Sequence, residues 1–131
     1  MAVVAAAALA GSGCGGSGSP ARGPSRPQSL SAADRAAVRD AQNEIHAYCR
    51  SVASYLAGRT PPPSRETGER ASDAVRQLGS IARAKPDARY KGETVGEVMG
   101  DIAEDLEGSN CSNELAAELD AELRSVPQPR N

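Results

Sequence analysis

The chain has 131 residues, with 15 basic and 17 acidic side chains, three cysteines, three tyrosines, and neither phenylalanine nor tryptophan. The basic residues are scattered and side chains that could stack on bases are nearly absent, which argues against a nucleic-acid-binding module. The first ~30 residues are unsuited to packing, so roughly 100 remain for one small domain. Its aliphatic core would be thin, and a covalent cross-link would help to stabilise it.

The charges are divided along the chain. Residues 1–92 hold 13 of the basic and 7 of the acidic residues, for a net charge of +6, whereas residues 93–131 hold the other 2 and 10, for a net charge of −8. Two interpretations are open: the basic front and the acidic back attract each other within the fold, or the acidic part binds a partner.

The first residues are typical of an export signal. Ala2 to Ala10 form a weakly apolar run that is too short to span a bilayer but suits the central region of such a signal. No basic residue precedes this run, so we expect translation to begin a few residues upstream. The run is followed by Gly11-Ser12-Gly13-Cys14, and the two together resemble the lipobox of bacterial lipoproteins. The sequence departs from that family at Gly11, where Leu, Val or Ile is usual.

The resemblance covers residues 1–14 and says nothing about the folded domain. It implies that residues 1–13 are a signal peptide and that Cys14 is acylated and becomes the lipid anchor. The protein would then lie outside the cytoplasm, held to a bacterial cell membrane. Cleavage after Ala8-Leu9-Ala10 would instead release a secreted soluble protein, and a cytosolic protein with a low-complexity N-terminus is a further alternative.

Residues 14–30 are rich in Gly, Ser and Pro. Because this composition cannot bury enough apolar surface to fold, we expect a disordered tether. A flexible segment of about 16 residues spans roughly 20–25 Å on average, which suits a spacer between a membrane surface and a small domain.

A long amphipathic helix is predicted between Ser31 and Leu56, and the rest of the chain is expected to dock on it. Ser31 and Asp34 approximate a capping box at its start. Gly58 suits the position just past its end, and the prolines at 61–63 forbid its continuation. Its apolar residues recur at steps of three and four, namely Val38, Ala41, Ile45, Tyr48, Val52 and Tyr55.

Three shorter helices are predicted after it. The first runs from about Arg65 to Lys85, and Gly79 either weakens this helix or allows it to approach the long helix closely. Residues 86–92 form a turn-rich connection. A capping box at Thr94 and Glu97 begins the next helix, which Gly108 should end, and the last helix runs from about Glu114 to Ser125. The apolar stripes are Ala71, Val75, Leu78, Ile81 and Ala82, then Val95, Val98, Met99, Ile102 and Leu106, then Leu115, Leu119 and Leu123.

The sequence contains no alternating β-branched run and no Asn-Gly hairpin signal. The predicted fold class is therefore all-α, a small up-down-up-down four-helix bundle over residues 31–126, followed by a disordered tail at residues 127–131.

The cysteine count gives a further constraint. Acylation of Cys14 would leave Cys49 and Cys111 as a pair. At 1.5 Å per residue the second helix descends about 30 Å and the third climbs about 20 Å, which returns the chain to the level of Cys49 just before Cys111. We therefore predict a disulfide between the first helix and the turn between the third and fourth helices, as expected outside the cytoplasm. Two unrelated buried thiols are the alternative.

No catalytic residue, metal site or cofactor is predicted. His46 is the only histidine, and a zinc site would need three or four ligands, so we expect its ring to lie partly in solvent. Asp101, Glu104 and Asp105 lie on a predicted helix rather than in a calcium-binding loop. They form either a solvated surface or an acidic face that binds a partner.

The leading hypothesis is a non-enzymatic interaction module, anchored to the membrane through Cys14, with an unknown protein or envelope partner. The alternative is a small-ligand or envelope-polymer binding protein that uses a groove beside the two short helices, and an enzyme of unknown type is third. A self-filled core with a flat acidic surface would favour the first hypothesis, and an apolar pocket would favour the second.

Overall fold

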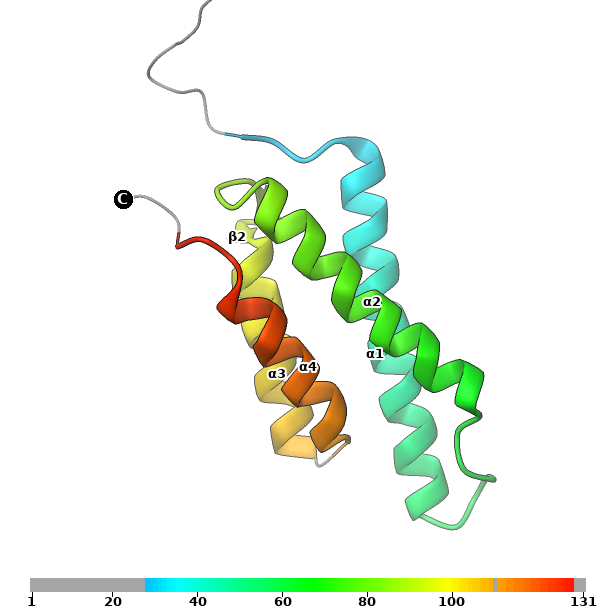
Figure 1. The fold of residues 1–131 in the computed structure, drawn as a ribbon. Helices are drawn as coiled ribbons and strands as arrows, with labels where there is room; N and C mark the ends of the chain where they lie inside the picture. Colours follow the sequence, from blue (N-terminus) through cyan, green and yellow to red (C-terminus); the bar gives the residue numbers. More distant parts are fainter. Residues whose placement is uncertain (1–27, 110, 129–131) are drawn as a thin grey trace, which may run out of the picture.

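The computed structural model describes residues 28–109 and 111–128, so the predicted signal peptide, Cys14, most of the predicted tether and the end of the tail lie outside the described residues. The described part contains four helices and two short strands. Their order is α1 (Ala32–Leu56), α2 (Arg65–Ala84), β1 (Arg89–Tyr90), β2 (Glu93–Thr94), α3 (Val95–Ser109) and α4 (Asn113–Arg124). Successive helices run in alternating directions (Figure 1), and the predicted small helical bundle is confirmed.

The helix starts follow the sequence signals. In α1 the backbone N–H of Asp34 donates to Ser31 Oγ at 3.0 Å, and the N–H of Ser31 donates to Asp34 Oδ2 at 3.2 Å. In α3 the N–H of Glu97 donates to Thr94 Oγ1 at 3.1 Å and the N–H of Thr94 donates to Glu97 Oε1 at 2.8 Å. Both predicted capping boxes are therefore present, and each satisfies two backbone donors that the helix leaves free.

The end of α1 is set by Gly58. This glycine has φ +75°, in the left-handed region that a residue with a side chain rarely adopts. Its N–H donates to the carbonyl oxygen of Tyr55 at 2.9 Å, while the N–H of Arg59 donates to that of Ser54 at 3.0 Å. This pair of bonds is the Schellman motif, and it turns the chain toward the proline-rich connection to α2.

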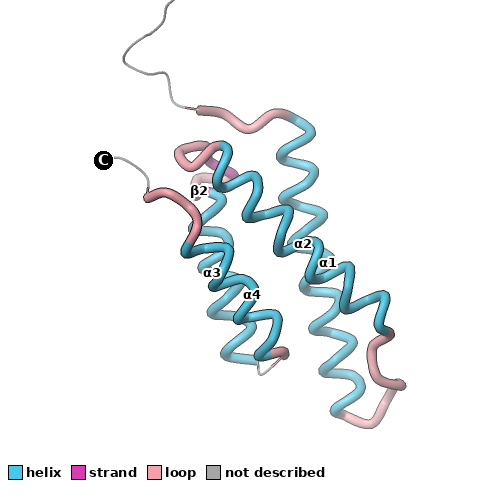
Figure 2. Tube along the Cα trace, viewed as in Figure 1, coloured by secondary structure: helices cyan, strands magenta, loops and turns pink. Residues whose placement is uncertain are grey.

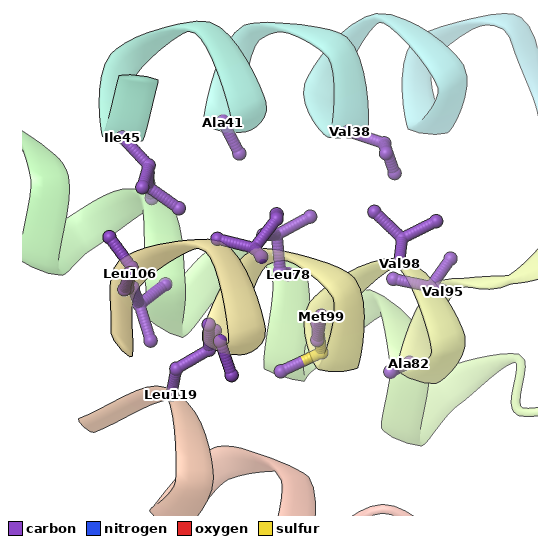
Figure 3. Close-up of a cluster of buried hydrophobic side chains, with 14 of the residues drawn as sticks. Val38, Ala41, Ile45, Leu78, Ala82, Val95, Val98, Met99, Leu106 and Leu119 are labelled. Carbon is purple, nitrogen blue, oxygen red and sulfur yellow. The ribbon is translucent and has the colours of Figure 1, made fainter. Parts of the chain in front are cut away.

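The core lies where α2 packs on α1 on one side and on the α3–α4 hairpin on the other. Figure 3 shows Val38, Ala41 and Ile45 of α1 pointing at the side chains of α3, with Leu78 of α2 and Leu119 of α4 among them. The largest fully buried side chains are aliphatic or methionine, namely Ile45, Leu78, Met99, Leu119, Val38, Val75 and Val95. The core is therefore self-filled, as a chain without phenylalanine or tryptophan requires.

The apolar stripe of α1 is buried only over its first half. Val38, Ala41 and Ile45 are at most 2% exposed, whereas Tyr55 is 44% exposed and Leu56 69% exposed. The far end of α1 extends beyond the start of α4 (Figure 1), so the last residues of the stripe are not covered by the second hairpin. The other helices therefore dock on α1 as expected, mainly along the first half of its stripe, and Tyr48 and Val52 are only partly buried against the core. We call the end formed by residues 49–71 the open end, and the opposite end of the bundle the closed end.

The connection between α2 and α3 contains a hairpin that the sequence analysis did not predict. Strands β1 and β2 pair antiparallel, with Arg89 opposite Thr94 and Tyr90 opposite Glu93. Figure 2 marks this short paired segment beside the end of α2. The two turn residues, Lys91 and Gly92, have φ +52° and +90°, which is the conformation of a tight hairpin turn with two left-handed residues. The strands are two residues long, too short to produce an alternating pattern.

The predicted disulfide is confirmed. Cys49 of α1 and Cys111, which precedes α4, are bonded with their Cα atoms 5.3 Å apart across 62 positions of sequence. The agreement supports the counting of helix rises, because one helix in the wrong direction would have separated the two cysteines by tens of ångströms.

The folded part begins earlier than predicted. Leu30 was assigned to the tether, yet it is 4% exposed and belongs to the core. The Lys85 ammonium donates to the carbonyl oxygen of Ser29 at 3.2 Å and to Asp34 Oδ2 at 2.8 Å. The N–H of Asp87 donates to Gln28 Oε1 at 3.2 Å. A single leucine after a polar stretch gives no periodic signal, which explains the error. We call these contacts of residues 28–34 with the end of α2 the N-terminal clasp.

Gly79 allows a close helix approach, although to a different helix from the one expected. A Cβ atom at this position would lie 2.8 Å from Cδ and 3.0 Å from Cβ of Glu122 on α4. Glu122 in turn accepts a hydrogen bond from Arg83 at 2.6 Å. The glycine therefore makes room for α4, not for α1.

Candidate functional site

The described part of the chain contains an open groove of about 530 Å³ bounded by α1, the first half of α2 and the start of α4. We call it the tyrosine groove, because Tyr48 is the aromatic side chain in its lining. The lining residues are Tyr48, Arg65, Gly68, Glu69, Ser72, Asp73, Arg76, Ser112, Glu114, Leu115 and Glu118. Most of them are polar or charged, so the groove differs from the apolar pocket that a typical small-molecule site presents.

The charges on the α2 side of this groove are paired. Arg65 Nε lies 3.4 Å from a carboxylate oxygen of Glu69, and Arg76 forms an ion pair with Asp73. Each of these pairs is formed within α2 and leaves no net charge. The net charge of the groove is therefore set by the acidic residues of α4.

The α4 side contributes two carboxylates, Glu114 and Glu118, and neither forms an ion pair among the described residues. Glu118 Oε2 accepts a hydrogen bond from Ser72 Oγ at 3.2 Å. Glu118 Oε1 is buried and has no hydrogen-bond partner in the described part of the chain. A buried carboxylate oxygen without a hydrogen-bond partner is costly, so the described fold leaves the carboxylate of Glu118 only partly satisfied.

The disulfide positions two of the groove walls. Tyr48 directly precedes Cys49, and Ser112 directly follows Cys111. Ser112 also caps α4, because its Oγ accepts from the N–H of Leu115 at 3.1 Å. The cross-link therefore fixes the distance between the aromatic wall on α1 and the start of α4.

The floor of the groove is kept open by Gly68. A Cβ atom there would lie 3.7 Å from Cε1 of Tyr48, which is an ordinary van der Waals distance. An alanine would consequently fit without a clash and would occupy space that the groove now offers.

The predicted acidic face is present on α3. Asp101, Glu104 and Asp105 are all exposed, and none forms an ion pair within the described residues. A hydrogen bond with Asp101 raises the pKa of Glu93 above its usual value, aided by desolvation and by the nearby charges. These acids therefore repel one another without a compensating cation of this chain, and the face is open to a partner.

Attraction between the basic front and the acidic back is carried by other residues. Arg83 pairs with Glu122 at 2.6 Å, and Arg89 lies 3.9 Å from Glu97. Both pairs join the two parts of the chain that the charge division separates. The two interpretations of that division thus apply to different residues, since the acids of the α3 face do not take part.

His46 is exposed, as expected, and its neighbour Cys49 is held in the disulfide. With Leu106 and Ser109 these residues border a second hollow of about 400 Å³, which Glu104 and Asp105 also line. Because the sulfur is already bonded, the histidine and cysteine do not form a nucleophilic pair.

Cys14, the predicted lipid anchor, lies outside the described residues. Of the helices in residues 28–109 and 111–128, none combines the length and apolar character needed to cross a bilayer. Within the same residues, no three potential metal-binding side chains gather in one place.

The tyrosine groove was not predicted in detail. The sequence analysis named a groove beside the short helices but none of its residues, and it treated Tyr48 as a core position. One signal could have found it: once Cys49 and Cys111 are paired, the residues next to them, Tyr48 and Ser112, are brought close together.

Comparison with protein-family models, with curated proteins and with solved structures found no match for this chain.

Proposed function

We propose that this chain is an extracytoplasmic interaction module, held to a bacterial membrane through a lipid on Cys14 and without enzymatic activity. The observation that carries the proposal is the Cys49–Cys111 disulfide. Structural disulfides of this kind form and persist outside the reducing cytoplasm, which agrees with an export signal at the start of the chain.

The surface of the domain supports an interaction role. Its core is self-filled, the tyrosine groove is open and polar, and Asp101, Glu104 and Asp105 of α3 have no ion-pair partner in the described residues. Small-molecule sites are usually enclosed and mostly apolar, whereas protein partners are attracted and oriented by charged surfaces of this kind.

Fractionation of cells tests the anchoring. Wild-type protein is expected in the membrane fraction, and the Cys14→Ala chain in the soluble fraction, because acyl chains supply about 0.8 kcal/mol per buried CH₂ and the tether supplies no comparable attraction. Labelling with a fatty-acid analogue provides the direct control. Membrane retention of the Cys14→Ala chain, or a wild-type protein that never takes the label, would remove the lipid anchor from the proposal.

A charge reversal tests the partner role of the acidic face. Asp101→Lys together with Asp105→Lys should change stability little, since exposed charges contribute about 0–1 kcal/mol. Capture of partners from native membranes should decrease, and its dependence on salt should weaken. Glu107→Lys, at another exposed acid of the same helix, is the matched control. Equal capture by all variants would show that this face is only solvated.

A second candidate function is binding of a small ligand or an envelope polymer. The tyrosine groove favours it, because a volume of about 530 Å³ is large enough for a small molecule. Native mass spectrometry of protein purified from its own membranes distinguishes the two functions. A ligand of constant mass retained on the wild-type chain would favour the second.

A further inference from the structure

We propose that the tyrosine groove binds a basic side chain, lysine or arginine, presented by a protein partner. This inference rests on the proposed interaction function and deepens it, because it assigns the chemical group that the module recognises. It concerns a region separate from the acidic face of α3, since the groove is lined by α1, α2 and α4.

The lining of the groove contains more acidic than basic side chains. Both guanidinium groups that line the groove are neutralised by Glu69 and Asp73 of their own helix. The remaining lining carboxylates, Glu114 and Glu118, have no ion-pair partner in the described part of the chain. The groove therefore offers an excess of two negative charges to a cation, in a concave place where the walls exclude part of the solvent.

The carboxylate of Glu118 has an oxygen without a hydrogen-bond partner among the described residues. Glu118 lines the groove and is partly exposed; among the described residues its Oε2 accepts a hydrogen bond from the Ser72 hydroxyl, and its buried Oε1 has no partner. An ammonium or guanidinium group is the donor that such a carboxylate favours most, because charge-assisted hydrogen bonds are about twice as strong as neutral ones. A cation in the groove would thus provide a charged hydrogen-bond donor to Glu118, which the described part of the chain does not provide.

The lining of the groove combines aromatic, aliphatic and acidic side chains. Tyr48 of α1 lines the same groove as the two α4 carboxylates, and Gly68 of α2 lies beside the tyrosine ring. A tyrosine ring attracts a cation placed over its face, and the aliphatic part of a lysine or arginine side chain packs on apolar surface such as Leu115. A long side chain with a terminal cation fits this combination of an aromatic, an aliphatic and an acidic wall.

The choice of a protein partner follows from the openness of the groove. The site is a trough on the surface rather than an enclosed pocket, so a free amine would leave most of its surface in water. A side chain held by a partner has part of its ordering cost covered by contacts elsewhere in the interface.

The test uses the full Cys14→Ala chain, so that its outcome does not depend on lipidation. Backbone amide NMR spectra are recorded during titration with Nα-acetyl-lysine amide, with Nα-acetyl-norleucine amide as the neutral control of similar length. We expect the lysine probe to shift the signals of residues 68–72 and 112–118, and the norleucine probe to leave them unchanged. Shifts with both probes, with neither, or spread over the α3 face would overturn the assignment.

Two pairs of variants sharpen the titration. Glu118→Gln should weaken binding of the lysine probe about tenfold, because a hydrogen bond to a charged group is lost, whereas Glu107→Gln on α3 should leave it unchanged. Equal weakening by the two would mean a nonspecific attraction to an acidic protein and would refute the site.

The second pair addresses the space in the groove. Gly68→Ala fills the floor, and Gly100→Ala makes the same change on α3, where a Cβ atom would meet nothing within 4 Å. Both should raise the melting temperature, because alanine favours the helix more than glycine does. Only Gly68→Ala should weaken binding of the probe, and equal affinity of the two variants would contradict the proposal.

A titration with butylamine distinguishes a free amine from a lysine side chain of a protein partner as the cation in the groove. The proposal expects butylamine to bind much more weakly than a lysine-containing peptide taken from a captured partner, and equal affinity would replace the protein partner with a free amine. If wild-type protein still captures partners from membranes while Glu118→Gln captures them equally well, the groove assignment fails and the interaction function stands.

Discussion

The two ends of the bundle contain the same kind of sequence and differ in how it is buried. Val38 and Val52 occupy equivalent positions on the stripe of α1, two heptads apart. At the closed end Val38 is 0% exposed beneath the second layer of helices, whereas Val52 toward the open end is only partly buried, and Tyr55 and Leu56 beyond it are exposed. Hydrophobic periodicity therefore identifies the face that can be buried, and the reach of the partner helices decides how much of it is buried.

Helix length explains the difference. α1 and α2 contain 25 and 20 residues, against 15 and 12 for α3 and α4. At 1.5 Å per residue, the second hairpin covers little more than half of the first. The disulfide lies near the boundary, where the short hairpin ends.

Breaking the disulfide should give the largest effect, because it ties the short hairpin to the long one. A cross-link across 62 positions contributes about 4 kcal/mol in the chain-entropy model. Cys49→Ser, Cys111→Ser and the reduced wild type should lose similar amounts of unfolding free energy, measured by denaturant titration. Added reductant should leave the unfolding free energy of a variant that carries both Cys49→Ser and Cys111→Ser unchanged. A melting curve of wild type that does not respond to reduction would contradict the prediction.

The same truncation at the two ends tests the comparison directly. Val38→Ala should cost about 1.5–3 kcal/mol, because buried methyl groups are lost and a cavity is left. Val52→Ala, chemically identical on the same helix, should cost less than about 1 kcal/mol, as is usual where the side chain is partly in solvent. Urea unfolding measures both. Similar losses at the two positions would mean that the open end is covered in solution, for example by a second copy of the chain.

The N-terminal clasp should give a smaller and local effect. Lys85→Met removes the ammonium that bonds to Ser29 and Asp34 but keeps most of the aliphatic stem. We expect a slight decrease in melting temperature, because the pair is partly exposed. Hydrogen exchange should accelerate at residues 28–34 and remain unchanged at the open end. Faster exchange across the whole of α1 would indicate that the clasp supports the fold globally.

The smallest expected effect concerns pH, and two acids of the closed end act in opposite directions. The hydrogen bond from Lys85 lowers the pKa of Asp34 below 3.8, so its contribution is present above that value and is lost as the pH falls through the lowered pKa. The pKa of Glu93 is raised above 4.5, chiefly by its hydrogen bond with Asp101, so ionisation of Glu93 disfavours the folded state as the pH rises past 4.5.

Glu93→Gln should therefore raise the melting temperature slightly at pH 7, because an amide donates to Asp101 without needing a proton. The difference from wild type should disappear at a pH below 4.5, where Glu93 is protonated. Melting curves between pH 3 and pH 8, with Glu107→Gln as the control for removal of one acid, measure this. An equal gain from Glu107→Gln at pH 7 would assign the effect to general charge rather than to this pair, and a gain that persists at low pH would assign it to a cause other than charge.

Several features of the fold followed from particular residues. The capping boxes at Ser31 and Thr94, the turn at Gly58 and the helix rises that pair the cysteines are all local or additive, so the sequence was sufficient to predict them. The hairpin at residues 89–94 and the burial of Leu30 depend on tertiary contacts, and neither leaves a periodic pattern in the chain.

The groove was harder to predict for the same reason. Tyr48 satisfies the apolar stripe of α1, and Glu118 looks like any exposed acid between the leucines of α4. Only the packing of α1, α2 and α4 shows that Tyr48 lines a groove and that Glu118, in the same lining, has a buried oxygen. Sequence patterns assign residues to faces, and they do not report the space left between two faces.

The place where the chain joins the bundle has a consequence for how the domain is presented. The described chain begins and ends toward the closed end, while the proline-rich connection lies at the opposite end (Figure 1). A domain held through Cys14 would therefore stand on its closed end, with α1 rising about 37 Å above it. The tyrosine groove, on the first half of α2 and the start of α4, would then face outward at the upper part of the domain. With the proposed anchoring, a longer tether would raise the groove without rebuilding it, and spacer length would set the distance from the membrane at which a partner is met.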